Sequence, residues 1–165
     1  MNFLKTATAA ALVLSMAPFA YAQSAKTPQE FATMAASSDM LELESSKLAL
    51  EQAQNASVKE FAQMMIKDHT TASENLKAAA SKDGVTVPAE MLPKHAAEVQ
   101  KLNGQTGAEF DAAYVKTQVA AHEEALALMK SYAENGEGAT KAHAEKTAPV
   151  IQMHLEHAQE MNKGM

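Results

Sequence analysis

The sequence contains no cysteine, and each of its 14 basic residues is a lysine. Without cysteine the chain cannot form a disulfide, a thiolate zinc site, an iron–sulfur cluster or a catalytic thiol. The lysines are outnumbered by 20 acidic residues, which gives a net charge of −6 at pH 7 and leaves no basic stripe. Because phosphate binding requires clustered positive charge, the composition argues against nucleic acid as a partner.

The sequence also lacks the short motifs of several enzyme classes. It has no phosphate-binding loop, no nucleophile elbow and no Ser/His/Asp spacing. The 165 residues, 47% of them hydrophobic and 21% charged, are enough for one packed core and too few for two ordinary domains. Composition alone indicates no activity, so the prediction of function depends on where the polar residues lie along the chain.

The first 22 residues have the layout of a secretory signal peptide. Lys5 supplies a positive charge, an apolar run follows over residues 7–17, and Ala20-Tyr21-Ala22 forms a small-x-small cleavage site. The run is shorter than the roughly 20 apolar residues that a membrane-spanning helix needs. We therefore expect residues 1–22 to be removed and residues 23–27 to form a linker. Export without cysteine fits the bacterial periplasm, and an uncleaved N-terminal anchor is the alternative.

Helix start and stop signals divide the rest of the chain. Thr27-Pro28-Gln29-Glu30 combines an N-cap, a proline in the first turn and a glutamate three residues after the cap, which is a capping box. Similar patterns begin at Ser57 and Thr106, and Asn or Gly residues supply the stops. These signals predict four long helices, at residues 28–54, 58–82, 107–134 and 139–162, and a short helix at 93–102.

The lengths of the connections predict how the long helices are arranged. Short turns join the first two and the last two, so each pair should form an antiparallel hairpin. More than 20 residues separate the two pairs, enough to cross the bundle from end to end. Two hairpins with one long crossover form a ferritin-like four-helix bundle, which we expect to occupy residues 28–162. Pro149 lies inside the last helix and should kink it.

Each of the last three long helices carries one histidine in its apolar stripe, namely His69, His122 and His154. In the first helix, Glu44 lies near the middle of a broad apolar arc. Counted from the hairpin turns, Glu44 matches His69 in height, and His122 matches His154 to within about 3 Å. If the two hairpins align, one carboxylate and three imidazoles meet inside the core.

Such a buried group needs partners, because an unpaired polar group costs several kcal/mol. A transition-metal ion satisfies a carboxylate and several neutral imidazoles together, so these four residues predict one bound ion of zinc, copper, nickel or iron. No Glu-x-x-His stands at the required positions, which disfavours a di-iron oxidase centre. The alternative is a structural hydrogen-bonded network that adds Ser73 and Tyr114.

A second metal-binding pattern lies at the C-terminal end. Met153, His157 and Met161 are four residues apart on one helix face, which would suit a periplasmic copper(I) site. Methionines at helical spacing more often fill a core, so this is the weaker prediction.

Four other polar residues are expected to lie outside the metal group. Asp68 should point about 100° away from its histidine neighbour and be solvated. His95, at the start of the short helix, and His143, near a bundle end, are expected to face solvent. Asp111 is either an outer partner of the site or part of the acidic first turn of its helix.

An ordered set of motifs resembles a known bacterial family. The segments are Phe31, the run Asp39 to Leu50, the run Phe61 to Thr70, Phe110-Asp111 with Tyr114, Gln118 to His122, and Ala148-Pro149 with His154. They resemble domain of unknown function 4142 over about residues 28–162. The resemblance implies an exported, ferritin-like bundle, and members are often labelled outer membrane proteins, although the mature chain has no apparent membrane-spanning segment. The sequence departs from the family at Ala148, where leucine is common, and at His143, where the residue is usually apolar or aromatic.

Three functions fit these features, and the resemblance adds no established activity. The leading hypothesis is a periplasmic bundle that binds or handles a transition metal; whether it is an enzyme is left open, with the residues favouring no catalytic role. The second is an envelope stress or interaction protein whose polar core only fixes the register of the helices. The third is an oxidase or catalase-like enzyme, which the lack of a second carboxylate pair argues against. The sequence leaves open whether the bundle forms a homodimer and which proteins it meets.

Overall fold

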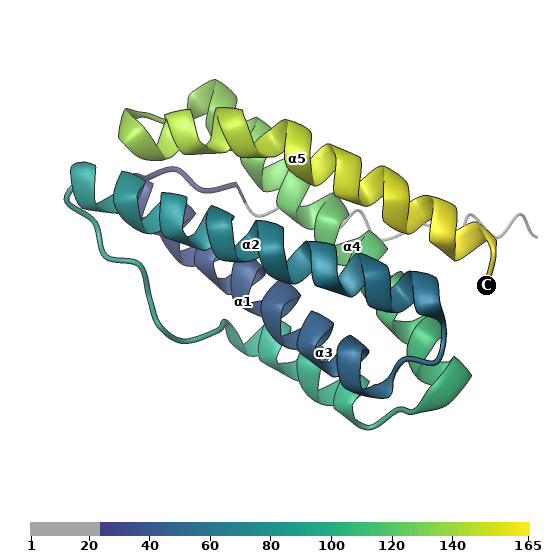
Figure 1. Ribbon diagram of the computed structural model, residues 1–165. Coiled ribbons are helices and arrows are strands. Elements are labelled where there is room, and N and C mark those ends of the chain that lie inside the picture. Colours follow the sequence, from purple (N-terminus) through teal and green to yellow (C-terminus); the bar gives the residue numbers. More distant parts are fainter. Residues whose placement is uncertain (1–23) are drawn as a thin grey trace, which may run out of the picture.

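The computed structural model describes residues 24–165, and the predicted signal peptide at residues 1–22 lies outside the described residues (Figure 1). The described part consists of helices and connecting segments, without strands. The helices are α1 (Pro28–Gln52), α2 (Ala56–Lys82), α3 (Pro93–Asn103), α4 (Gly107–Asn135) and α5 (Gly138–Lys163). The all-α prediction of four long helices and one short helix is confirmed, and Pro149 is accommodated inside α5.

The helix ends show which start signals the chain uses. At α1 the complete capping box forms, with Thr27 and Glu30 each accepting from the other's backbone N–H. The box predicted at Ser57 does not form, because α2 begins earlier and the Asn55 side chain caps it by accepting from the Ser57 N–H. Thr106 precedes α4 as predicted, but its side chain makes no capping hydrogen bond.

The long helices pack as two hairpins. Within them, α1 packs against α2 and α4 against α5, and the hairpins meet through the α1–α4 and α2–α5 pairs. The crossover after α2 returns along the length of the bundle and carries α3, which packs against α1 and α4 (Figure 1). Among residues 24–165, no helix is both long enough and apolar enough to cross a membrane.

The apolar core is divided into two clusters along the bundle. One cluster contains Phe31, Leu76, Met129 and Tyr132 among its members, and the other contains Phe61, Met65, Phe110 and Tyr114 among its members. Along α1, α2 and α4, the residues between these two clusters include buried polar side chains, and on α5 the buried His154 lies between Ile151 and Leu155 of the first cluster. A polar layer therefore crosses the middle of an otherwise apolar bundle.

Two aspartates join the hairpins at opposite ends. The Asp83 carboxylate, just after α2, accepts hydrogen bonds from the backbone N–H groups of Ala139 and Thr140 at 2.7 Å, in the first turn of α5. The Asp111 carboxylate of α4 accepts from the backbone N–H groups of Gln54 and Asn55, in the turn between α1 and α2. Asp111 therefore stabilises the start of α2, which is neither of the two roles predicted for it.

Replacing Asp83 by asparagine should lower the free energy of unfolding at pH 7 by about 1–3 kcal/mol, because the hydrogen bonds to α5 lose their charge. Although burial opposes the effect, these bonds hold the pKa of Asp83 below its ordinary value of 3.8. The carboxylate's contribution is therefore complete above pH 3.8 and is lost as the pH falls through the lower folded value.

Urea unfolding at pH 7 and at about pH 2.5 measures this difference between wild type and Asp83→Asn. The exposed carboxylate of Glu51 provides a control, as Glu51→Gln should change stability little. An equal loss from both variants would contradict the assigned role, and so would a difference that is undiminished in acid.

Candidate metal centre

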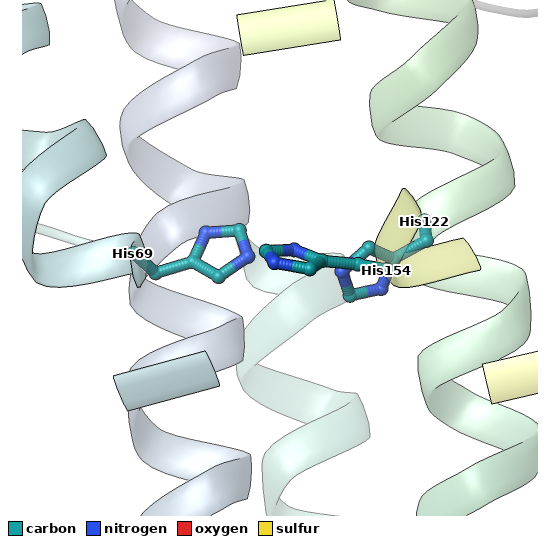
Figure 2. A group of neighbouring side chains, drawn as sticks. All are labelled: His69, His122 and His154. Carbon is teal, nitrogen blue, oxygen red and sulfur yellow. The ribbon is translucent and has the colours of Figure 1, made fainter. Parts of the chain in front are cut away.

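Three histidines from three different helices meet in the polar layer. His69 of α2, His122 of α4 and His154 of α5 point toward one another (Figure 2) and are 2%, 1% and 0% exposed. Their ring centroids are 5.5–5.7 Å apart. One nitrogen from each ring lies within 4.8 Å of the others, a grouping that could hold a metal ion. The structure thus brings together the three histidines that the sequence pattern selected.

The outer nitrogen of each ring has a hydrogen-bond acceptor. His69 Nδ1 lies 2.8 Å from Asp39 Oδ1, His122 Nδ1 lies 2.9 Å from the backbone oxygen of Gln118, and His154 Nε2 lies 3.1 Å from Asp68 Oδ2. Because carbonyl and carboxylate oxygens only accept, each outer nitrogen carries a proton and donates it. These bonds fix the orientation and the tautomer of each ring.

The inner nitrogens have no hydrogen-bond partner. They are His69 Nε2, His122 Nε2 and His154 Nδ1, all buried. With the proton held on the outer side, each inner nitrogen of a neutral ring presents a lone pair. Buried polar atoms are nearly always paired in folded proteins, and these three nitrogens together form a donor set that one ligand could share.

Two of the three rings are strongly biased toward the neutral, ligating form. Burial, together with the neighbouring charge of His69, lowers the pKa of His122 to about 4. Burial and the other two histidines lower the pKa of His154 to about 4 as well. For His69, burial also acts to lower the pKa, but the hydrogen bond to Asp39 and the charge of Glu42 outweigh it and raise the value.

Glu42 of α1 is a buried carboxylate close to His122. Its side chain is 1% exposed, and neither carboxylate oxygen has a hydrogen-bond partner. Oε1 lies 3.7 Å from His122 Nδ1, and burial raises the pKa of Glu42 to about 7 against the opposing charge of His69. Each of the three histidines therefore has a carboxylate near its outer nitrogen, from Asp39, Glu42 or Asp68.

The predicted carboxylate ligand, Glu44, is not part of this group. Its side chain is 51% exposed and accepts a hydrogen bond from Lys47 Nζ at 2.7 Å. The prediction was wrong because it took the middle of the apolar arc of α1 as the inward face. Leu41 is buried, but the buried face of α1 also carries Asp39, Glu42, Ser45 and Ser46, so polar side chains point inward as well.

Three predictions of solvent exposure were also wrong. Asp68 is only partly exposed, since its carboxylate holds His154. His95 is 5% exposed, with Nδ1 2.8 Å from Ser37 Oγ, because α3 packs over α1. His143 is 7% exposed and lies against the ring of Phe31. These three side chains are covered by contacts with other helices, and a projection of a single helix does not show such contacts.

Further polar pairs continue the layer. Ser46 Oγ and Tyr114 Oη are 2.8 Å apart, and Gln118 Nε2 donates to Ser45 Oγ at 3.1 Å. Part of the structural network considered above is therefore present, with Tyr114 in it. In the C-terminal copper(I) pattern, Met153 and His157 are both exposed. The His157 ring packs edge-on against Phe61, with centroids 5.1 Å apart.

Comparison with solved structures supports the helical fold. The chain is similar to a DUF305 fragment from Deinococcus radiodurans, with a TM-score of 0.74, 13% identity, and coverage of 86% of this chain and 99% of that one. A DUF305 protein from Streptomyces coelicolor, described as a candidate secreted protein, has a TM-score of 0.69 and 12% identity, with coverage of 84% and 92%. At these identities the likeness shows a shared fold.

Sequence comparison identifies the family. No curated protein matches the chain significantly. The profile described as "Domain of unknown function (DUF4142)" matches residues 14–161, which is most of the sequence. The protein therefore belongs to the DUF4142 family.

Proposed function

We propose that this protein is an exported bundle of the ferritin-like type that binds one transition-metal ion through His69, His122 and His154. The observation that carries the proposal is the set of three buried ring nitrogens without partners, one from each of three helices. Leaving such atoms unpaired costs free energy at each position, whereas one ion would satisfy all three.

The surroundings of the histidines favour a cation. Outer hydrogen bonds from ligating histidines to carboxylates or carbonyls are a recurrent feature of metal sites, because they orient the ring and raise its basicity. Here Asp39 and Asp68 accept the outer hydrogen bonds of His69 and His154. Glu42 adds a third carboxylate, near the outer nitrogen of His122. A divalent ion would balance this buried negative charge.

The three imidazole ligands limit which metal ions can bind and what chemistry the site can support. Imidazole suits zinc, copper, nickel and iron, and the chain offers no thiolate to select among them. Three protein ligands leave at least one position on the ion for water or a small molecule. We favour binding or handling of the metal over catalysis, because the described residues supply no second set of ligands.

The place of action is proposed from the N-terminal sequence. Residues 1–22 have a signal-peptide pattern, and the Streptomyces coelicolor protein of similar fold is described as a candidate secreted protein. We therefore place the mature protein in the periplasm.

A structural polar core is the second candidate function. The Ser46–Tyr114 and Ser45–Gln118 pairs favour it, because they fix helix register without any ion. In that case the protein would act through envelope partners. This alternative leaves the three inner ring nitrogens unsatisfied, which is why the metal hypothesis is preferred.

Titration of the chelator-treated protein with zinc distinguishes the two. The metal hypothesis predicts one ion bound per chain and a melting temperature that rises with free zinc, since a ligand that binds only the folded state stabilises it by about 2.7 kcal/mol at 100 times its Kd. Copper, nickel and iron tested in the same way rank the metals. Melting that is indifferent to all four ions and to chelator would support the structural core.

A further inference from the structure

A groove between α2 and α5 is a second feature that the metal proposal does not use. Its volume is about 760 Å³, within the usual range for small-molecule sites. The two helices run side by side in opposite directions (Figure 1). The other seam between the hairpins, between α1 and α4, is where α3 packs. The crossover thus covers one seam with a helix, and the α2–α5 seam is hollow.

The groove is open to solvent and is lined by apolar side chains together with polar ones, among them Thr71, Asn75 and Thr147. Two of the three large apolar side chains that are exposed among the described residues, Val150 at 38% and Met153 at 52%, line it. Its floor and sides include five alanines, Ala72, Ala78, Ala79, Ala139 and Ala142. No aromatic side chain apart from His143 lines it, so a flat aromatic ligand would find little to stack on.

The charge of the groove is opposite to that of the chain. Lys67, Lys82 and Lys146 line it, with Asp68 as its single acidic residue. The Asp68 carboxylate already accepts a hydrogen bond from His154. A local excess of lysine in a chain of net charge −6 is not what composition alone would give. The groove therefore suits a ligand with negative charge.

We propose that the α2–α5 groove binds a single-chain aliphatic carboxylate. The chain would lie along the alanines and contact Val150 and Met153, and the carboxylate would pair with a lysine of the rim. The groove extends from Lys67 to Lys82 on α2, which is about 22 Å at 1.5 Å per residue and long enough for an extended acyl chain. Lysines spread over this length suit a singly charged head better than a phosphate, which needs clustered positive charge. This proposal does not rest on the metal proposal, although Asp68 lines the groove and also accepts a hydrogen bond from His154.

The test compares three ligands that share a 12-carbon chain and differ in the head. The chelator-treated protein is titrated calorimetrically with dodecanoate, dodecyl maltoside and dodecyltrimethylammonium, each below its micelle concentration. We expect one dodecanoate per chain and at least tenfold weaker binding of the other two. Equal binding of all three would overturn the assignment of a carboxylate.

Two variants place the binding in the groove. Ala142 is exposed and lines the groove, so Ala142→Phe should fill the space and abolish dodecanoate binding while the bundle stays folded. Ala120, an exposed alanine of α4 outside the groove, provides the matched control Ala120→Phe. Lys146→Glu should weaken dodecanoate binding at least tenfold. Binding that survives Ala142→Phe would overturn the proposal, and so would a dimer that this variant dissociates, since a second copy would then occupy the groove.

Discussion

Replacing His154 by alanine should weaken zinc binding by more than about 100-fold, the upper end of the loss seen when only an orienting partner of a ligand is removed. The His154→Ala variant loses one of the three inner nitrogens, and His69→Ala or His122→Ala should act in the same way. Calorimetric titration of the chelator-treated protein measures the affinity directly.

The chain provides a matched control for this loss. His143 lies on the same helix, is 7% exposed and has Nε2 3.4 Å from Thr147 Oγ1, so His143→Ala removes the same atoms from a buried place outside the group. It should keep full zinc affinity. If His154→Ala does not fold, as circular dichroism would show, His154→Gln serves instead, because it keeps polarity and most of the volume. Equal zinc affinities of the His154 and His143 variants would contradict the proposed site.

The Glu42→Gln substitution should have opposite effects with and without metal. In the metal-free protein, burial raises the Glu42 pKa from 4.5 to about 7, so the folded state binds this proton more tightly than the unfolded state. The cost of ionising Glu42 is therefore absent below pH 4.5, grows as the pH rises from 4.5 to about 7 and is complete above about 7. At pH 8, Glu42→Gln should make the metal-free protein more stable, by up to about 3 kcal/mol.

With zinc bound, the carboxylate should become favourable. Its charge then lies beside a cation and near the outer nitrogen of His122, so Glu42→Gln should lower zinc affinity by about 10–100-fold. Urea unfolding at pH 8 in chelator, and zinc titration, measure the two effects. Glu44→Gln is the control, since Glu44 is exposed on the same helix and should change neither. A metal-free Glu42→Gln variant less stable than wild type would show that this carboxylate has a stabilising partner without metal.

The helices were predictable because their signals are local. The capping box at Thr27, the proline at position 28 and the turn residues after each helix depend only on neighbours in sequence. The three histidines were predictable for a related reason. Each interrupts an apolar stripe of period 3.6, and similar distances from the hairpin turn place His122 and His154 at nearly one height.

The carboxylates were not predictable in the same way. In α1 the buried face contains acids and serines beside Leu41, so the middle of the apolar arc falls on Glu44 in place of Glu42. The Asp39–His69 and Asp68–His154 pairs each join two helices, and their formation depends on how the helices are rotated about their axes. Hydrophobic periodicity fixes that rotation only where the buried face is apolar.

The central claim, that the three histidines hold a metal, is tested most directly by elemental analysis. The protein would be exported to a bacterial periplasm and purified without chelators and without a histidine tag, alongside His154→Ala and His143→Ala. We predict about one equivalent of a single transition metal in the wild type and in His143→Ala, and none in His154→Ala. A folded wild-type protein without metal, which also takes up none of the four ions on addition, would contradict the account and leave the polar layer a structural one.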